Sequence, residues 1–327
     1  MNEWLRSRLV CPRDKEKLEN KDENLICPLN HIYPIVEGIP VMLVNEAETT
    51  HGYIGQTLEK VAALNDKRNE TENETKRINE VDEFVQSEIP YTSGILYIPL
   101  KNKLTRYPIP EFRLPPGNGE KLLDIGCNWG RWSIAAGQRG YQPIGIDPSL
   151  NAVVAARRVS KQLGVNANFV VGDARFLPFA TDCFDVVFSY GVFQHFSKEN
   201  VRISLDEIVR VLKKDGKTLF QMPNKYGMRS FYQQWRRGFT EGEGFEVRYW
   251  TPSELLETFK EKFGETEMTT DCYFGLGIQK SDVDMLPLPY KIVVHSSDIL
   301  RKVSRKIAPM IKVADSVYLE SVNENNK

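Results

Sequence analysis

The sequence is poor in cysteine and contains no long apolar run. Five cysteines in 327 residues are too few and too dispersed for a disulfide framework. Three of them, Cys127, Cys183 and Cys272, are expected to be small buried groups. No stretch of about twenty apolar residues occurs, so no membrane-spanning helix is expected. The opening residues, MNEWLRSRLVCPRD, lack the apolar core of a secretory signal. These absences favour a reducing, cytoplasmic setting.

An excess of charge of one sign is also absent. The formal net charge is −1, with 43 Lys and Arg against 44 Asp and Glu. No overall field attracts nucleic acid, so a nucleic-acid partner is not expected. The chain is 41% hydrophobic and 27% charged, which is typical of a globular protein. Its length suits one large domain and a smaller one.

Four segments differ in composition. Residues 1–45 hold short β-rich pieces separated by Pro and Gly. Residues 46–120 begin charged and helical, contain the polar stretch NDKRNETENETKRINE, and end proline-rich, which is typical of a connector; YTSGILYIPL within it is a candidate lid. Residues 121–280 alternate apolar strands with helices, and residues 281–327 form a basic tail. The alternation predicts an α/β fold with a doubly wound parallel sheet, whose ligands bind at the carboxyl ends of the strands.

The first strand of that region ends in the stretch LLDIGCNWG. Asp124 ends the strand, and Gly126 and Gly130 suit a sharp turn whose backbone N–H groups face a ligand. The dinucleotide pattern G-x-G-x-x-G would need glycine at Asn128 and Arg131, so it fits poorly. The pattern acid-x-G-x-G-x-G lacks only its middle glycine. Asparagine stands there, and it tolerates a left-handed backbone better than other non-glycine residues.

Three further strand ends carry compatible residues. Asp147 ends the second strand, 21 residues beyond Gly126, and Asp173 follows the third strand in GDA. The fourth strand runs through Ser189 and Tyr190 into a small-and-aromatic turn. Parallel strands present their carboxyl ends at one edge of the sheet, so these residues are expected to meet in one site.

This succession resembles the class I S-adenosylmethionine-dependent methyltransferases over about residues 120–280. The resemblance implies a Rossmann-like sheet of seven strands, the last antiparallel, with S-adenosylmethionine as cofactor. It implies that Asp147 holds the ribose, that Asp173 accepts from the adenine amino group, and that Ser189 and Tyr190 line the floor beneath the sulfonium. The residues expected to form the cofactor site are Asp124, Gly126, Cys127, Gly130, Asp147, Asp173, Ala174 and Ser189.

Methyl transfer mainly requires that cofactor and acceptor be aligned, because the sulfonium already activates the methyl group. A hydroxyl acceptor also needs a base. The candidate is His195, six residues past Ser189; the alternative is that His195 packs at the start of a helix. The expected acceptor is a small molecule or a lipid- or saccharide-linked group. Two alternatives remain open: a cofactor-binding regulatory partner without turnover, and a nicotinamide-dependent oxidoreductase.

The N-terminal stretch CPRDKEKLENKDENLICPLNHIYPIVEGIPVML resembles a second family, the small zinc-ribbon-like activator subunit of tRNA and release-factor methyltransferases, here fused in cis. A zinc ribbon carries C-x2-C twice. This chain has Cys11-x2-Asp14 and Cys27-x2-Asn30, followed by His31. Cys11 and Cys27 are therefore candidate metal ligands, and Asp14 and His31 would complete a mixed zinc site. The alternative is a metal-free ribbon held by an apolar core of Tyr33, Ile35, Ile39, Val41 and Leu43.

The loop after the fifth strand, NKYGMRSFYQQWRRGFTEGEGFEVRYW, is rich in aromatic residues and carries five Lys or Arg against three Glu. An anionic or aromatic acceptor is one interpretation, with Tyr226, Arg229 and Arg248 as candidate contacts. Three aromatic residues stand at helical spacing and are expected to pack inside the protein: Phe231, Trp235 and Phe239.

The basic tail has six Lys or Arg against one Asp within residues 291–312. Its pattern predicts a helix, interrupted at Pro309, that docks on the domain with its basic side outward. The alternative is an amphipathic helix in peripheral contact with a membrane surface.

Overall fold

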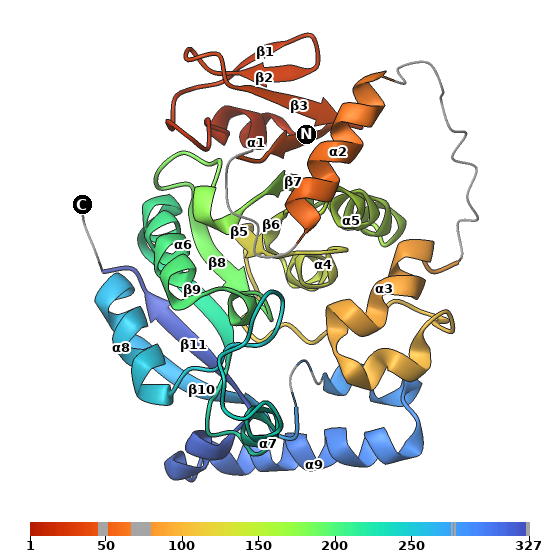
Figure 1. Ribbon diagram of the computed structural model, residues 1–327, viewed down its shortest axis with the longest axis vertical. Helices are drawn as coiled ribbons and strands as arrows, with labels where there is room; N and C mark the ends of the chain where they lie inside the picture. Colours follow the sequence, from red (N-terminus) through yellow and green to blue (C-terminus); the bar gives the residue numbers. More distant parts are fainter. Residues whose placement is uncertain (45–51, 67–79, 276, 278, 325–327) are drawn as a thin grey trace.

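The computed structural model describes residues 1–44, 52–66, 80–275, 277 and 279–324. Within these residues eleven strands form one sheet in the order β1-β2-β3-β4-β7-β6-β5-β8-β9-β11-β10 (Figure 1). The predicted α/β sheet is confirmed, but it has more strands than the seven expected, because the N-terminal strands are joined to its edge.

The centre of the sheet is parallel, as predicted. Neighbouring strands pair β7 with β6, β6 with β5, β5 with β8, and β8 with β9 in parallel register. Their almost continuous apolar sequences suit strands that are covered on both faces. The strands are β5 (Lys121–Ile125), β6 (Gln142–Asp147), β7 (Asn168–Gly172), β8 (Phe184–Ser189) and β9 (Leu212–Pro223).

Helices cover the two faces. Leu122 packs in a cluster with residues of α4, whereas the next residue, Leu123, packs with residues of α6 and α8. Because successive strand residues point to opposite faces, α4 lies on one face and α6 and α8 on the other. The cluster around α5 contains Phe169 and Val171, whereas Val170 belongs to the cluster of α6 and α8. The helices are α4 (Arg131–Gln138), α5 (Leu150–Gln162), α6 (Lys198–Val211) and α8 (Pro252–Phe263).

Local sequence signals set where these helices begin. The Ser149 side chain caps α5 by accepting from the backbone N–H of Ala152. Thr251 caps α8 in a capping box with Glu254, and Pro252 occupies the first helical position. Side-chain oxygens at these positions satisfy N–H groups that have no partner within the helix.

The seventh strand of the expected sheet lies far along the chain. β11 (Ser316–Val322) is antiparallel and sits between β9 and β10 (Thr266–Cys272). It falls inside the segment expected to be a separate tail. The boundary expected at residue 280 therefore does not separate the sheet from the tail, because residues beyond it complete the sheet.

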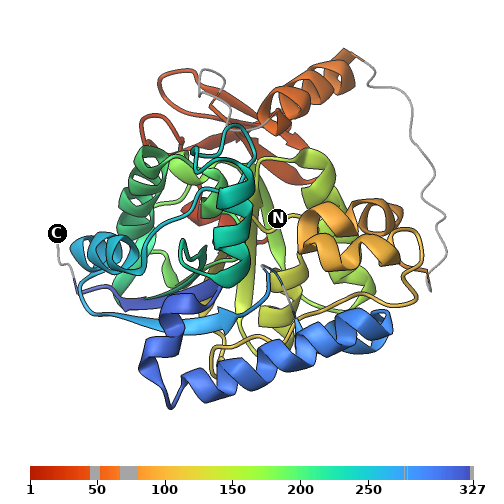
Figure 2. The same ribbon diagram turned by 60° about the horizontal axis from the view of Figure 1, so that its bottom comes forward.

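Helix α9 (Leu288–Ser304) precedes β11 and runs along the end of the molecule opposite the N-terminal strands (Figure 2). It docks through a face that includes Val294, Ser297 and Asp298. Its outward side includes Lys302, whose side chain is 58% exposed, but it also carries the apolar Leu288 and Ile299, which are 71% and 61% exposed. No helix in the described part of the chain is long and apolar enough to span a bilayer.

The N-terminal segment is not a separate body. It forms α1 (Glu3–Arg8), β1 (Glu19–Lys21), β2 (Asn24–Ile26), β3 (Ile32–Val36) and β4 (Ile39–Met42). β4 pairs in parallel with β7, with Val41 opposite Val171. Leu5, Leu9 and Cys11 belong to the same core cluster as the central strands. The segment thus covers an edge of the sheet that would otherwise expose unpaired backbone groups.

The connector between these parts is more ordered than the sequence indicates. It contains α2 (Tyr53–Asp66), α3 (Glu83–Ser93) and the short helix η1 (Ile95–Leu100). The expected extended run from residue 91 therefore begins instead with the end of α3 and with η1. Most of the polar stretch NDKRNETENETKRINE lies outside the described residues.

A buried ion pair joins α4 to the segment after the sheet domain, and the same arginine is hydrogen-bonded to the connector. Arg131, the first residue of α4, pairs with Asp282 in η4 (Lys280–Met285). The Arg131 guanidinium also bonds the Tyr97 hydroxyl at 2.9 Å and the Pro108 carbonyl at 2.7 Å. Arg131 is 6% exposed and Asp282 is fully buried. Each buried charge is therefore neutralised by its partner, without which its burial would be costly.

Replacing Asp282 by alanine should destabilise the protein strongly, because Arg131 would keep a buried charge without its counter-ion. We expect the free energy of unfolding to fall by about 3–5 kcal/mol, measured by urea unfolding. Asp282→Asn, which keeps an acceptor, should lose less. The exposed neighbour Asp284 provides the control, since Asp284→Ala should change stability by about 0.5 kcal/mol or less. Equal losses for Asp282→Ala and Asp284→Ala would contradict this account.

Candidate functional site

A cavity of about 340 Å³ lies at the carboxyl ends of the parallel strands. Its lining includes Gly126 after β5, Asp147 at the end of β6, Asp173 after β7 and Tyr190 after β8. The four strand ends thus meet at one cavity, at the edge of the sheet where the sequence predicts a site. The volume falls in the range of ligand pockets.

The turn between β5 and α4 has the expected left-handed backbone. Asn128 has φ 46°, and Gly126 and Gly130 have φ 72° and 82°. Asparagine thus occupies the position where the motif usually has glycine without changing the turn. A Cβ atom at Gly126 would collide with the Val192 side chain, so glycine is needed there for both space and conformation.

Asp147 is held firmly at the cavity wall. One carboxylate oxygen accepts from the Asn128 N–H at 3.0 Å and the other from the Ser149 N–H at 2.9 Å. Burial raises the pKa of Asp147 to about 6, against the lowering effect of these two hydrogen bonds. A carboxylate oxygen accepts more than one hydrogen bond, so both oxygens retain capacity for ligand hydroxyls.

Four of the expected cofactor residues do not line the described cavity. Asp124 is buried and accepts from the Ser133 hydroxyl at 2.6 Å. The Ser189 hydroxyl donates to the Ile125 carbonyl at 3.1 Å. Cys127 is buried, and Gly130 serves as the N-cap of α4. These residues shape the turn and the sheet, and their side chains are absent from the described lining.

Asp173 and Ala174 do line the cavity. The Asp173 carboxylate is already paired, because the Arg175 guanidinium reaches it at 2.6–3.1 Å. Asp173 also accepts from the Arg175 N–H at 2.9 Å. An adenine amino group would therefore share this carboxylate with an arginine, which the sequence pattern did not indicate.

Two helices from the connector also reach the cavity. Tyr53 and Ile54 of α2 line it, and Thr57 anchors that helix beside Asp147. The Thr57 hydroxyl donates to the Pro148 carbonyl at 2.8 Å and accepts from the Leu150 N–H at 3.1 Å. The sequence analysis missed these residues because nothing local marks a helix that docks so far from its sequence neighbours.

The candidate lid was identified in part. Tyr91, Thr92 and Gly94 line the cavity, together with Pro90 just before the expected stretch. The rest of that stretch forms η1 and packs away from the cavity, where Leu96 and Tyr97 join a separate core cluster.

The remaining wall is aromatic. The rings of Trp132 and Tyr190, both lining residues, lie 4.5 Å apart between centroids. The Tyr190 hydroxyl donates to Asp271 at 2.8 Å and accepts from Gln279 at 2.9 Å. Burial raises the pKa of Tyr190 well above its usual value, so it stays neutral. An aromatic wall attracts cationic ligand groups such as a sulfonium.

His195 lines the same cavity. Its Nδ1 lies 2.7 Å from the Phe245 carbonyl oxygen and its Nε2 lies 3.0 Å from the Gln194 side-chain nitrogen. The ring stacks on Phe245 with centroids 3.8 Å apart. A carbonyl only accepts, so Nδ1 carries the proton and Nε2 holds the lone pair. The Nε2 lone pair accepts from the Gln194 side-chain nitrogen, so an acceptor proton reaches it only if that amide is displaced; the ring also packs on Phe245.

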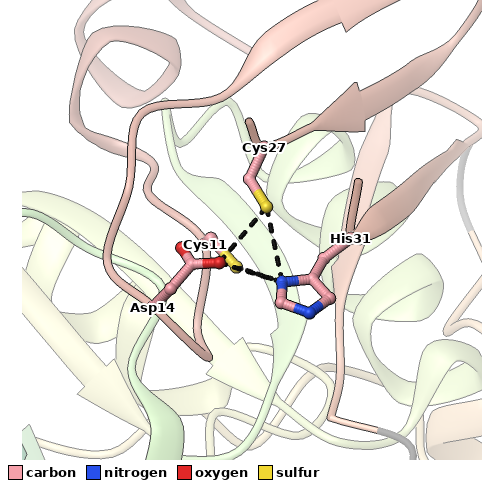
Figure 3. Close-up of side chains that lie close together, drawn as sticks. All are labelled: Cys11, Asp14, Cys27 and His31. Carbon is pink, nitrogen blue, oxygen red and sulfur yellow. Dashed lines mark hydrogen bonds and ion pairs between the residues drawn. The ribbon is translucent and has the colours of Figure 1, made fainter. Parts of the chain in front are cut away.

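A separate cluster stands in the N-terminal segment. One ligand-type atom from each of Cys11, Asp14, Cys27 and His31 lies within 4.8 Å of the others. His31 Nδ1 is 2.9 Å from Asp14 Oδ2 and 3.3 Å from Cys27 Sγ, and 3.5 Å from Cys11 Sγ (Figure 3). Cys11 and Asp14 come from one turn and Cys27 and His31 from another, and the four side chains point to one centre.

The apolar alternative for this segment also has support. Tyr33, Ile39, Val41 and Leu43 are at most 3% exposed. The Tyr33 hydroxyl lies 3.1 Å from Cys11 Sγ. A buried apolar core and a cluster of candidate metal ligands thus occur together, and the core does not exclude a metal site.

Comparison with known proteins identifies the family. Residues 122–216 match the model of a methyltransferase domain. The demethylmenaquinone methyltransferase of Oceanobacillus iheyensis is 33% identical over 178 residues, covering 50% of this chain and 72% of that protein. An uncharacterized methyltransferase of Bacillus subtilis, YcgJ, is 36% identical over 100 residues, covering 30% of this chain and 39% of that protein.

One solved structure similar to the chain is a complex of the Haloferax volcanii Trm112 methyltransferase activator with a methyltransferase. It has 15% identity and a TM-score of 0.47, and the match covers 85% of this chain and 99% of that one. The chain spans less than half the length of several curated relatives it matches. The similarity to the demethylmenaquinone methyltransferase, which is matched over 72% of its length, shows that this chain belongs to the class I S-adenosylmethionine-dependent methyltransferases.

The family implies S-adenosylmethionine as cofactor, and the cavity suits it. A buried carboxylate at Asp147, a turn that needs glycine at Gly126 and an aromatic wall at Trp132 and Tyr190 meet in one cavity. These groups match a ribose, a close backbone approach and a sulfonium, respectively.

Asp124 should make stability depend on pH. Burial raises its pKa to about 7 from 3.8, so between about pH 4 and 7 the folded chain keeps a proton that the unfolded chain has lost. This group therefore lowers stability as the pH rises through that window. Asp124→Asn lacks the group, so its stability relative to the wild type should increase from pH 4 to pH 7.

Urea unfolding at several pH values measures this difference, with the exposed Asp182→Asn as control. A stability difference between Asp124→Asn and the wild type that stays constant from about pH 4 to 7 would contradict the assignment.

Proposed function

We propose that the protein transfers the methyl group of S-adenosylmethionine to a small-molecule or lipid- or saccharide-linked acceptor. The observation that carries this proposal is the Asp147 carboxylate, fixed by two backbone N–H groups beside the left-handed turn at Gly126 and Asn128. The arrangement offers a paired acceptor for ribose hydroxyls next to backbone that a ligand can approach closely.

Each residue has a defined task in this scheme. Asp147 would accept from the ribose hydroxyls, and the Gly126 turn would bring backbone against the methionine end. Trp132 and Tyr190 would face the sulfonium and keep water away. The cofactor supplies an activated methyl group, so the protein contributes mainly alignment.

A hydroxyl acceptor would lose its proton to His195. The Nδ1 hydrogen bond to the Phe245 carbonyl leaves the lone pair on Nε2, where the acceptor hydroxyl would take the place of the Gln194 side-chain nitrogen that lies 3.0 Å away. The relatives named for demethylmenaquinone and for ubiquinone biosynthesis support an acceptor of the small or lipid-linked class. The regulatory alternative predicts cofactor binding without turnover, and the oxidoreductase alternative is disfavoured by the glycine spacing.

The first test is cofactor affinity. Asp147→Asn should weaken S-adenosylmethionine binding by about 1.5–3 kcal/mol, which is roughly ten- to a hundredfold in Kd. Calorimetry measures this, and circular dichroism checks that the variant is folded. Asp182→Asn, exposed and remote from the cavity lining, should bind as the wild type does. Unchanged affinity in Asp147→Asn would remove that residue from the site.

The second test concerns turnover. With a hydroxyl acceptor, found by screening extracts with labelled cofactor, His195→Gln should lower the rate by about 10²–10⁴-fold. Its affinity for S-adenosylmethionine should stay near that of the wild type. His295→Gln, at an exposed position on α9, is the matched control. Full turnover in His195→Gln would leave this histidine with a packing role.

We also propose that Cys11, Asp14, Cys27 and His31 bind one zinc ion. A tetrahedral zinc about 2.0–2.3 Å from each ligand keeps the ligand atoms roughly 3.3–3.8 Å apart; His31 Nδ1 lies 2.9–3.5 Å from the other three ligand atoms, and no two ligand atoms are more than 4.8 Å apart. All three residue types are zinc ligands. The Tyr33 hydroxyl would donate to the Cys11 sulfur and steady it. The ion would fasten the loops of the N-terminal strands, far from methyl transfer.

Elemental analysis of the purified chain should find about one zinc per chain, and chelation should lower the melting temperature because binding energy is folding energy. Cys27→Ser should lose the metal, whereas Cys183→Ser, at a buried cysteine outside the cluster, should keep it. If the wild-type protein is metal-free and its melting temperature does not change when the chelator is added, the apolar-core alternative is favoured.

A further inference from the structure

A second cavity, of about 610 Å³, adjoins the first. Gly94, Gln194 and Phe245 line both cavities, so a ligand in the second cavity can extend into the first. The shared residues include the neighbour and the stacking partner of His195. The second cavity therefore lies where an acceptor would have to pass or bind.

One helix supplies most of the charge in this cavity. Arg229, Gln233, Arg236 and Arg237, from α7 (Met228–Arg236) and the residue after it, all line the cavity. They are spaced i, i+4, i+7 and i+8, which is one helical face. The opposite face carries Phe231, Trp235 and other exposed aromatics. The expectation that these aromatics pack inside was wrong, because the polar face is the one turned inward.

The two acidic residues of the cavity are already engaged. The Asp315 carboxylate accepts from the N–H groups of Ser230 at 2.8 Å and Phe274 at 2.7 Å. Glu246 pairs with Arg237 at 3.5 Å. Arg237 also donates to the carbonyl oxygens of Thr240 and Val247, so it has a structural role and little capacity for a ligand.

Arg229 and Arg236 remain uncommitted. Within the described residues neither guanidinium has an ion pair or a side-chain hydrogen bond; Arg236 only lies over the Tyr232 ring, 5.9 Å from its centroid. Arg248, the other candidate acceptor contact, is different, because it donates to the carbonyl oxygens of His195 and Gly244. Among the described residues, these two positive charges thus line the cavity without an ion-pair partner, beside the Asp315 carboxylate and the Arg237–Glu246 pair.

The spacing of the two arginines limits what can balance them. Seven residues of helix separate them by about 10 Å along the axis, a gap that two long side chains can close around one group. Guanidinium groups bind phosphate oxygens in a bidentate manner. A single carboxylate would neutralise only one of the two charges, whereas a phosphate or diphosphate can neutralise both.

We propose that the acceptor bears a phosphate or diphosphate, bound by Arg229 and Arg236 in the second cavity while the atom to be methylated reaches the first cavity past Gln194 and Phe245. This inference rests on the proposed methyltransferase function. It assigns the two arginines to acceptor binding, and it defines the acceptor by its anionic group.

Calorimetric titration of the full chain with inorganic pyrophosphate tests the proposal. The wild type should bind it, and Arg229→Ala and Arg236→Ala should each weaken binding by about ten- to a hundredfold. Arg229→Lys keeps the charge but loses the bidentate guanidinium geometry, so it should weaken pyrophosphate binding less than Arg229→Ala does. Arg202→Ala, at an exposed arginine on α6, should bind as the wild type does. Absence of binding to the wild type at about 1 mM pyrophosphate, or equal binding by the Arg229 and Arg236 variants, would overturn the proposal.

A parallel titration separates this proposal from the proposed function. S-adenosylmethionine should bind Arg229→Ala and the wild type equally. Normal S-adenosylmethionine binding without pyrophosphate binding would refute the anionic subsite alone. Pyrophosphate binding without S-adenosylmethionine binding would refute the proposed function and, with it, the assignment of the phosphate to an acceptor.

The source of the phosphate is resolved with vesicles. Sedimentation with phosphatidylcholine vesicles containing phosphatidic acid, lost in the Arg229→Ala, Arg236→Ala double variant, would support a lipid-linked phosphate. Pyrophosphate binding without such sedimentation would support a soluble phosphate-bearing acceptor.

Discussion

The buried pair of Arg131 and Asp282 is the constraint on which the site depends. Arg131 begins α4 directly after the glycine turn, so whatever fixes its guanidinium also fixes the turn. Asp282 and Tyr97 hold it from segments that lie before and after the strand–helix alternation. A charge buried this deeply is costly without its counter-ion, and the contacts of Arg131 hold the connector and the segment before α9 against the helix that follows the glycine turn.

The cavity consequently combines a sheet edge with helices from outside the alternating region. The sheet supplies Gly126, Asp147 and Tyr190, whereas α2 and α3 supply Tyr53 and Tyr91 from the other side. Helix α7 lines the second cavity, which is the proposed acceptor side. The sheet edge forms the part of the site proposed to bind the cofactor, whereas the added segments shape the space for the acceptor. Arg229 and Arg236 therefore indicate the charge of the acceptor, which the strand ends do not.

The sequence predicted the position of a residue well where that position follows from the topology of the sheet. Acids at the ends of successive parallel strands must meet at one edge, so Asp147 and Asp173 were correctly placed at the cavity. The sequence did not predict which way a side chain points, since Asp124 and Cys127 lie at the same edge but are absent from the described cavity lining. Helical spacing in the α7 aromatics predicted a helix but not its inward face, because a polar cavity reverses the usual preference. The docking of Tyr53 left no local signal at all.

The position of β11 has a consequence for how the chain folds. β9 and β10 are each hydrogen-bonded to β11, which follows β10 by more than forty residues. Until residues 316–322 have been synthesised and have inserted, both strands present unpaired edges to the solvent. Contacts so distant in sequence form slowly, and exposed strand edges invite association with other chains. A chain in which residues 316–322 have not yet inserted therefore exposes the edges of β9 and β10, even when the parallel half of its sheet is complete.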